Sequence, residues 1–342
     1  MKISDLDQRE ADIYARVASK DLRKTQRGDD MLRIAFADMS GSLSATLFSD
    51  HEDFERASDL TVGDVVKIRG HRGNYKGTPQ LQIHRVRLLD ERDDGKWDPD
   101  DVYGKGMAEL QDVAAAKIVI DIETAPRVAL DSMPASIREQ IEAIAKEREW
   151  PVDKVLSLNP LFSRVVSIAV GDATAPAGGH VLFAPLDGDV ESMAQDAPDW
   201  LLVRREVDML DQFWSLAAQA QLIVTFNGRN FDLPFLRNRS AILGVEVRCD
   251  LVSQPPYLHE PHLDLYQILT GSGFGARPMN LEAACWAFGI ESPKGEMDGS
   301  GVAAAFAEKR YRDIADYNLL DIDATRELYK KLQSTVLDHL SK

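Results

Sequence analysis

The chain has 342 residues, of which 44% are hydrophobic and 28% charged, and a formal net charge of -16. This length favours two domains over one, and the composition is that of a folded protein. The negative charge argues against nucleic-acid binding by electrostatics alone, because such binding depends on Lys and Arg that neutralise phosphates.

The sequence also bears on location. The start, from Met1 to Asp7, has no apolar core, and no stretch reaches the roughly 20 apolar residues of a membrane helix. Cys249 and Cys285 lie far apart and outside metal-ligand spacing, so we expect reduced, buried thiols. These features predict a cytoplasmic protein without a secretory signal or a membrane segment.

The charge is unevenly distributed. Residues 1–90 contain 15 basic and 15 acidic side chains, so residues 91–342 carry the whole net charge of -16. A neutral first part can still present a basic face. An acidic second part can bind a polyanion only where cations, such as divalent metals, offset its charge.

Residues 11–89 contain short alternating segments broken by glycine turns, which predicts a small all-β barrel or sandwich over residues 1–90. Leu32, Ile34 and Phe36 share one strand face, and a second strand leaves Phe48 among polar side chains. In the last strand the apolar positions change parity, which predicts a bulge near His84 and Arg85.

These segments resemble the nucleic-acid-binding OB-fold, through Leu32–Asp38 with Ser40-Gly41-Ser42, Gly63–Gly70 and Tyr75–Ile83. The resemblance implies a single strand lying across the barrel, with bases stacked on aromatic rings and phosphates bound by cations. We expect these roles for Phe48, Tyr75, Lys67 and Arg69, with Lys24, Arg33, Arg72 and Lys76 around them. Alternatively, these charges are ordinary solvated ones, Phe48 belongs to the core, and the barrel docks proteins.

Residues 91–106 are rich in acid, Gly and Pro and have no apolar period, so we expect an extended, solvated linker. The second domain is predicted over 107–342. Its strands and helices follow one another as in an α/β layered fold, and residues 125–162 have the character of an insertion that covers one edge or the site.

The first acidic motif closes the strand predicted over Lys117–Thr124. Asp121 and Glu123 are two residues apart, so their side chains point to the same face. Two like charges beside a buried strand repel each other unless a cation neutralises them. A divalent metal fits this pair, and a solvated turn is the alternative.

The second motif follows the predicted strand Leu222–Phe226, in the loop that carries Asn227, Phe231 and Asp232. Sites of α/β sheets form at the carboxyl ends of strands, which favours a functional Asp232. The alternative is an ordinary helix N-cap, since Asp232 precedes Leu233 and Pro234.

The third motif lies on the last predicted helix, Tyr311 to about Leu332. Its apolar stripe includes Tyr317 and Asp321, whereas Asp316 and Asp323 fall off the stripe and are expected to face solvent. An acid that faces a core is rare unless it is paired or binds metal. A structural hydrogen bond between Asp321 and Tyr317 is the alternative.

Together the three motifs resemble the DEDD-type 3'-5' exonucleases of the ribonuclease H-like fold, in the subclass with tyrosine, related to the proofreading domain of family B DNA polymerases. The segments His262–Leu265 and Lys294–Ser300 support the match. The resemblance implies two Mg²⁺ or Mn²⁺ ions held by Asp121, Glu123, Asp232 and Asp321. Tyr317 is then expected to orient the attacking water, and Thr124, Asn227 and Phe231 to contact the terminal nucleotides. Asp264 either supports the metal ligands or caps a helix.

The fold expected is therefore α/β, a ribonuclease H-like exonuclease domain preceded by an OB barrel. The function expected is a metal-dependent 3'-5' exonuclease that degrades single-stranded nucleic acid, with DNA favoured. Alternatives are an exoribonuclease, an endonuclease on the same fold, or a single-strand-binding protein with an idle nuclease fold. The sequence leaves open the choice of metal, the oligomeric state, the pathway and the role of residues 125–162.

Overall fold

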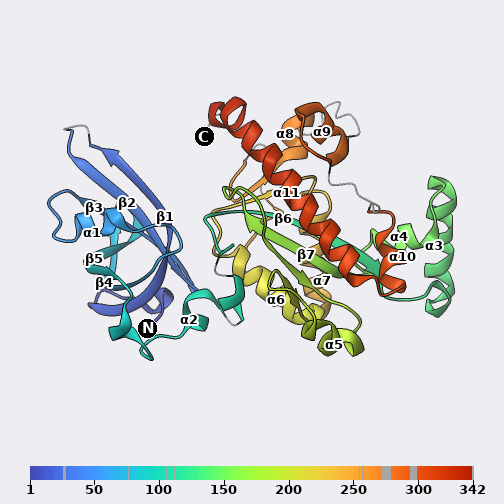
Figure 1. Ribbon diagram of the computed structural model, residues 1–342, viewed down its shortest axis with the longest axis horizontal. Coiled ribbons are helices and arrows are strands. Elements are labelled where there is room, and N and C mark those ends of the chain that lie inside the picture. Colours follow the sequence, from blue (N-terminus) through green and yellow to red (C-terminus); the bar gives the residue numbers. More distant parts are fainter. Residues whose placement is uncertain are drawn as a thin grey trace. The chain divides into compact units, whose positions relative to one another are not determined.

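The computed structural model describes residues 1–25, 28–75, 77–104, 106–110, 112–253, 255, 258–271, 279–292 and 299–340. The chain forms two compact units, Met1–Ala116 with Ser215–Gln221, and Lys117–Trp214 with Leu222–Lys342 (Figure 1). No helix in the described ranges has both the length and the apolar character that a bilayer span requires. The boundaries 1–90, 91–106 and 107–342 stay predictions.

The first unit contains a five-stranded antiparallel sheet with the order β3-β2-β1-β4-β5. Its edge strands β3 and β5 contact each other, so the sheet closes on itself as expected for a small barrel. Alternate residues point inward to one core, which includes Leu32, Ile34 and Phe36. The strands are β1 (Ala11–Lys24), β2 (Asp30–Asp38), β3 (Gly41–Phe48), β4 (Val65–Tyr75) and β5 (Thr78–Leu88), with α1 (Phe54–Asp59) between β3 and β4.

The predicted bulge is confirmed. Arg69 pairs with Arg85 and Gly70 with Ile83, so His84 is the extra residue in β5. Leu81 and Val86 accordingly both lie in the core despite their different parity.

The expectation of an extended, solvated linker is wrong. Residues 91–110 form three short helices: η2 (Glu91–Asp93), α2 (Pro99–Tyr103) and η3 (Met107–Leu110). Asp93 is buried because both of its carboxylate oxygens accept hydrogen bonds from Arg87, at 2.6 and 2.7 Å. Val102 and Tyr103 are buried as well, and α2 contacts β1 and β2.

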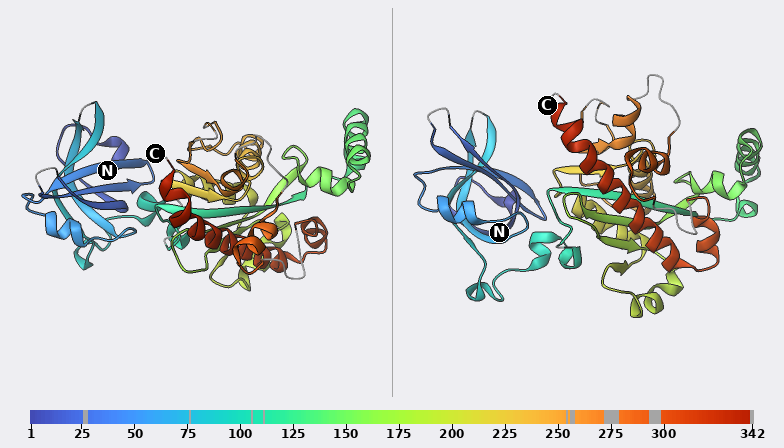
Figure 2. Two further views of the ribbon diagram at one scale, coloured as in Figure 1. Left: turned by 90° about the horizontal axis from the view of Figure 1, so that it is seen from above. Right: turned by 45° about the horizontal axis from the view of Figure 1, so that its top comes forward.

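The second unit is built on a six-stranded mixed sheet with the order β11-β10-β6-β7-β8-β9. β6 is parallel to β10 and antiparallel to β7. The long helix α11 (Tyr311–Thr335) crosses one face of this sheet and contacts β6, β7, β8 and β10 (Figures 1 and 2). The strands are β6 (Lys117–Pro126), β7 (Ser163–Asp172), β8 (His180–Phe183), β9 (Leu201–Val203), β10 (Leu222–Thr225) and β11 (His262–Asp264).

Most of the remaining helices pack around this sheet, and α3 lies beyond its end, next to α4 (Figure 1). These helices are α3 (Ala135–Arg148), α4 (Val152–Ser157), α5 (Val190–Gln195), α6 (Glu206–Ala217), α7 (Asp232–Leu243), α8 (Leu265–Thr270), α9 (Leu281–Phe288) and α10 (Val302–Ala307). Single 3-10 turns occur at Ile3–Asp5, Leu130–Ser132, Asp187–Asp189 and Leu337–His339.

The helix α11 approaches β7 closely because the strand offers it small residues. Ser167, Ala169 and Gly171 alternate on β7, opposite Glu123, Asp121 and Val119 of β6. A Cβ atom on Gly171 would lie 2.1 Å from Arg326 Nη2 of α11. Val119 packs in one core with Ile314, Ile322 and Leu328 of α11, so the same face of β6 turns Asp121 and Glu123 toward this helix.

Candidate active site

Three of the predicted metal ligands converge. One carboxylate oxygen from each of Asp121, Glu123 and Asp321 lies within 4.8 Å of the other two. The first two come from the middle of β6, and the third comes from α11. The helical stripe predicted for Asp321 agrees with its position, since this residue is only 7% exposed.

The fourth carboxylate reaches the same place from β10. Because β10 runs parallel to β6, the loop after it lies at the same edge of the sheet. Asp232 is the first residue of α7, and its Oδ1 accepts a hydrogen bond of 3.2 Å from the backbone N–H of Ile122. The N-cap of α7 is Phe231, so the alternative of Asp232 as an N-cap does not describe this structure.

Each of the four acids makes ionisation of the others less favourable. Burial, followed by the charges of Asp232 and the other two carboxylates, raises the pKa of Asp121 well above its ordinary value. Burial and the charges of Asp321 and Asp232 raise the pKa of Glu123 in the same way. Burial raises the pKa of Asp232 to about 7, against the effect of its backbone hydrogen bonds. Such a cluster binds a cation in its ionised form and protons otherwise.

Tyr317 lies beside this cluster, one helical turn before Asp321. Burial raises the pKa of Tyr317 far above its ordinary value, and the charges of Asp321, Glu123 and Asp121 add to the rise. A side-chain hydrogen bond to Asp321 contributes in the same direction. The phenol therefore stays protonated at neutral pH and can donate a hydrogen bond.

Asn318, to which no role was assigned from the sequence, contacts one of the acids. Asn318 is completely buried on α11, and its Nδ2 donates a hydrogen bond of 2.7 Å to Asp121 Oδ2. Its Oδ1 accepts one of 2.6 Å from Ser167 on β7. The signal was present, because Asn318 is three residues before Asp321 and shares its stripe, and a buried amide needs partners.

Of the three substrate-binding residues predicted in this unit, two line the cavity at the acids and one does not. Thr124 and Phe231 line the same cavity as the acids, although the hydroxyl of Thr124 already donates to the Ser157 carbonyl at 2.8 Å. Asn227 is not among the residues that line this cavity. It has a left-handed backbone (φ 66°), and its side-chain oxygen accepts a hydrogen bond from Asn230.

Asp264 acts through the loop that leads to Asp232. Its carboxylate caps α8 by accepting from the N–H of Tyr266, and it also accepts from the N–H groups of Asn227 and Arg229 at 2.8 and 3.1 Å. It therefore holds the loop after β10 in place.

Two further expectations about this unit have an outcome. Asp316 faces solvent beside Arg312, as expected, but the expectation for Asp323 is wrong. Asp323 accepts hydrogen bonds from the Gly178 N–H and from the fully buried Arg326, because the loop after β7 folds over this side of α11. Residues 294–298 of the predicted segment Lys294–Ser300 lie outside the described part of the chain.

In the barrel, the predicted aromatic contact residues are exposed, whereas several of the predicted basic ones are already paired with acids. Phe48 is 50% exposed on β3, so it does not belong to the core, and Tyr75 is 58% exposed at the end of β4. Lys67 and Arg69 both pair with Asp12, at 3.0 and 2.7 Å, which reduces their attraction for phosphate. Lys24 pairs with Asp30, Arg33 and Arg72 lie on β2 and β4, and Lys76 lies outside the described residues.

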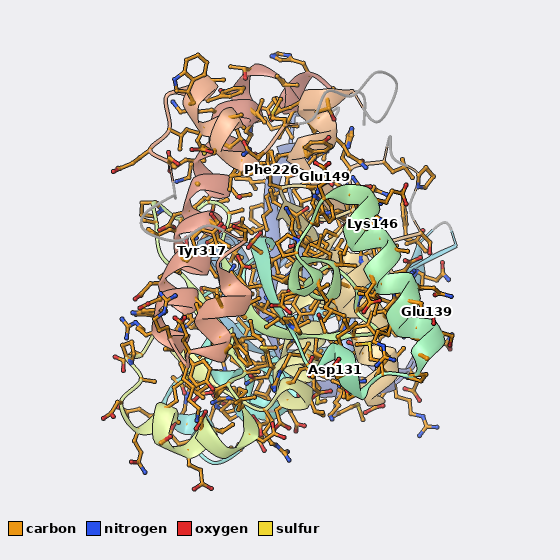
Figure 3. The ribbon with its side chains drawn as sticks, turned by 90° about the vertical axis from the view of Figure 1, so that its right-hand side faces the viewer. Asp131, Glu139, Lys146, Glu149, Phe226 and Tyr317 are labelled. Atoms are coloured by element: carbon orange, nitrogen blue, oxygen red, sulfur yellow. The ribbon has the colours of Figure 1, made fainter. Side chains whose placement is uncertain are left out.

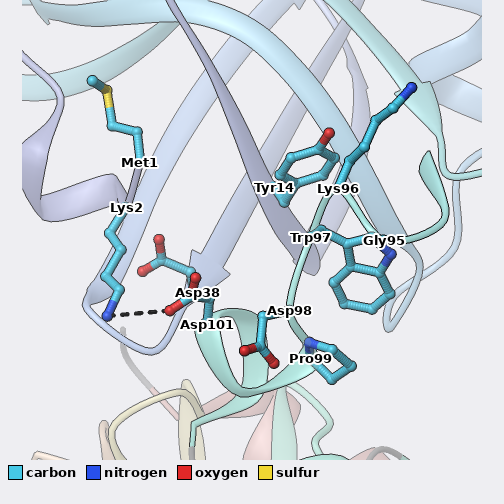
Figure 4. Close-up of a pocket in the computed structure, with 10 residues that line it drawn as sticks. All are labelled: Met1, Lys2, Tyr14, Asp38, Gly95, Lys96, Trp97, Asp98, Pro99 and Asp101. Atoms are coloured by element: carbon cyan, nitrogen blue, oxygen red, sulfur yellow. Dashed lines mark ion pairs between the residues drawn. The ribbon is translucent and has the colours of Figure 1, made fainter.

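Asp121, Glu123 and Asp321 line a cavity of about 1070 Å³ in the second unit, and Asp232 and Tyr317 are not among its lining residues. The first unit has a smaller one of about 470 Å³, between Tyr14, Trp97 and the N-terminal residues (Figure 4). Its acids Asp38, Asp98 and Asp101 outnumber its lysines, and Lys2 already pairs with Asp101. The larger cavity is therefore the better candidate for chemistry on an anionic substrate once metals are bound.

Fold and site together define an α/β exonuclease-type domain that follows an OB-type barrel. Residues 158–341, more than half of the chain, match the family described as "Predicted 3'-5' exonuclease related to the exonuclease domain of PolB", and the chain belongs to this family. Residues 12–89 match the family described as "OB-fold nucleic acid binding domain". The first match begins directly after α4, so β6 with Asp121 and Glu123 precedes the matched residues.

Similar proteins include DNA polymerase 1 of Aeropyrum pernix, which is 26% identical over 181 residues, or 48% of this chain and 18% of that protein. The family B DNA polymerase of Pyrobaculum calidifontis matches 94% of this chain and 46% of its own at 16% identity, with a TM-score of 0.42. The second OB-fold domain of replication protein A from Methanococcus maripaludis matches 27% of this chain and 95% of its own at 20% identity, with a TM-score of 0.22. The chain spans less than half the length of either polymerase.

Proposed function

We propose that the protein is a metal-dependent 3'-5' exonuclease that hydrolyses single-stranded nucleic acid, with DNA as the preferred substrate. The observation that carries the proposal is the convergence of Asp121, Glu123 and Asp321 within 4.8 Å, in a chain of this family. Asp232 completes the four-carboxylate set through its bond to the backbone of β6.

The donor set fits Mg²⁺ or Mn²⁺. Carboxylate oxygens are the hard ligands that these ions prefer. A bound cation offsets the burial, and then the mutual repulsion, that raise the pKa values of Asp121 and Glu123. When two such ions are bound, they lower the pKa of an attacking water and stabilise the leaving 3'-oxygen.

The chain's own groups have distinct roles in this proposal. The four carboxylates hold the ions, and Asn318 orients the carboxylate of Asp121. Tyr317 keeps its proton and orients the attacking water by hydrogen bonding, as in the tyrosine subclass. Phe231 and Thr124 contact the terminal nucleotide from the cavity wall.

A shortening assay tests this function. A 5'-labelled single strand should yield a ladder of shorter products with Mg²⁺ or Mn²⁺ and none with a chelator. Asp121→Asn and Asp321→Asn should abolish the ladder, and full activity in either variant would refute the proposal. A blocked 3' end stops an exonuclease and leaves an endonuclease unaffected.

The same assay separates the rivals. Single-stranded DNA, single-stranded RNA and duplexes of one sequence, each with Mg²⁺ and with Mn²⁺, distinguish a deoxyribonuclease from an exoribonuclease. A protein that binds the single strand tightly without turnover under all of these conditions is a binding protein with an idle nuclease fold.

A further inference from the structure

The cavity at the carboxylates has a second wall, and it comes from the segment between β6 and β7. Residues of this segment line the cavity together with residues of the helix α10, and α4 contacts both β6 and α10. Figure 3 shows the end of the second unit where α3, with Lys146, lies to one side and α11, with Tyr317, to the other. The residues of this wall that matter below are Arg127, Asp153, Lys154, Ser157 and Leu158.

This wall supplies the cations of the cavity. Among the described lining residues, Arg127 and Lys154 are the basic ones, and both are exposed. Neither forms an ion pair within the described parts of the chain, although Asp153 lines the cavity beside Lys154. Two unpaired cations on one wall therefore face an otherwise acidic site.

The wall is attached firmly to the strand that carries the acids. Thr124, the residue after Glu123, donates a hydrogen bond of 2.8 Å to the carbonyl of Ser157 at the end of α4. Ser163 donates one of 2.6 Å to the carbonyl of Leu156. The helices α3 and α4 also share a small core of their own, whose buried residues are Ile141, Ala145, Val155 and Leu156.

Lys154 is also held in place by an aromatic ring. Its Nζ lies 4.6 Å from the ring centroid of Trp150, on which Arg148 also stacks at 5.0 Å. Such a cation–π contact limits the freedom of the lysine without neutralising its charge.

The rest of the cavity suits bases and sugars. Leu158 and Leu186 are both more than 40% exposed, and α10 adds Phe306 and three alanines. The volume of about 1070 Å³ lies just above the roughly 300–1000 Å³ of drug-sized ligand pockets. The cavity is therefore large enough for more than one nucleotide.

We propose that Arg127 and Lys154 form a phosphate-binding wall that holds the last few nucleotides of the substrate strand while its 3' end lies at the carboxylates. This inference rests on the proposed function. Metals at the acids offset charge only at the scissile phosphate, so the neighbouring phosphates need counter-charges of their own. The wall gives the site a grip on short strands that does not depend on the barrel.

Steady-state kinetics with a 5'-phosphorylated trinucleotide, which carries two phosphates besides the scissile one, test this, because OB folds occupy about 4 to 16 nucleotides and contribute least to so short a strand. The double variant Arg127→Ala/Lys154→Ala should raise KM at least tenfold, with a smaller change in kcat. The slope of log(kcat/KM) against log[KCl] should become shallower by about 1.4, since each phosphate contact on a single strand contributes about 0.7. Asp153→Asn should change KM in the opposite direction.

The matched control is Lys146→Ala, an exposed lysine of α3 that does not line the cavity. It should leave KM unchanged, and Arg127→Lys/Lys154→Arg should restore most of the wild-type value. A KM for the double alanine variant equal to that of Lys146→Ala overturns the inference while the exonuclease activity stands. In an Asp321→Asn background, fluorescence anisotropy of a labelled trinucleotide should show the same tenfold loss, so the wall is tested even if the chain does not cleave.

Discussion

Asn318 Nδ2 donates a hydrogen bond of 2.7 Å to Asp121 Oδ2, and this bond joins the last helix of the chain to the central strand of its sheet. The opposite side of the same amide accepts a bond from Ser167 on β7. The amide thus has a single orientation, and it fixes which oxygen of Asp121 remains available to a metal.

We predict that Asn318→Ala lowers kcat or metal affinity about 10- to 100-fold, the usual effect of losing a group that orients a metal ligand. Titration of activity with Mn²⁺ at saturating substrate measures both quantities. Leu320→Ala, at an exposed position on the same helix, is the control and should behave as wild type. Identical Mn²⁺ titrations for the two variants would show that the amide has no positioning role.

Tyr317→Phe should slow hydrolysis at least tenfold and leave metal binding intact, because the hydroxyl orients water and is not a ligand. Metal binding is measured by the rise in melting temperature with Mn²⁺. The control is Tyr329→Phe, whose hydroxyl accepts a bond from Lys117 and which lies about 18 Å further along α11. Loss of the Mn²⁺-induced rise in Tyr317→Phe would instead assign the phenol to the metal site.

The contribution of the buried carboxylates at the site to the stability of the metal-free protein should fall as pH rises from about 4 to 7. Asp121, Glu123 and Asp232 have raised pKa values in the folded state, that of Asp232 about 7, so the folded chain binds more protons than the unfolded chain over this window. Metal ions compete with these protons. The melting-temperature increase caused by Mn²⁺ should therefore be larger at pH 8 than at pH 5.

This comparison uses the same protein at each pH, so groups remote from the metal cancel. One of these groups is His262. Burial lowers the pKa of His262 to about 3, so its contribution to stability rises with pH instead of falling. Asp121→Asn should remove most of the Mn²⁺ effect, whereas Asp316→Asn, an exposed acid of α11, should keep it. A Mn²⁺ effect that is independent of pH would mean that the carboxylates are ionised before metal binds.

In the barrel, we expect stacking to matter more than the paired cations. Phe48→Ala, in the inactive Asp321→Asn background, should weaken binding of a labelled oligonucleotide about 5- to 150-fold, the effect of one stacked base. Lys67→Ala should cost less than threefold, because Asp12 already offsets that charge. Leu88→Ala, at another exposed apolar position of the barrel, is the control, and an equal loss there would exclude a specific role for Phe48.

Much of this fold was predictable because its signals are local. Alternation of apolar residues identified the strands on both sides of each turn, and a change of parity located the bulge at His84. The stripe of α11 marked Asp321 as an acid that faces the core, which its 7% exposure bears out.

Both errors concern acids that lie outside any apolar pattern and that the folded chain nevertheless pairs with arginines. Residues 91–106 are acidic and have no apolar period, so an extended linker was expected. In the structure Asp93 is buried against Arg87, and α2 packs on β1 and β2. Asp323 lies off the helical stripe, yet it binds Arg326 and the loop at Gly178. Composition describes what a segment prefers in isolation, and an ion pair can bury it all the same.

By itself, the sequence determined the elements, the face on which Asp121 and Glu123 lie, and the inward position of Asp321, since all three follow from the periods of strands and helices. Only the tertiary structure decided that these acids meet. That required β10 to lie parallel beside β6 and α11 to cross the small residues of β7. It also decided the roles of Asn318 and of the wall with Arg127 and Lys154, because strand order and helix packing depend on contacts between residues that local periodicity does not connect.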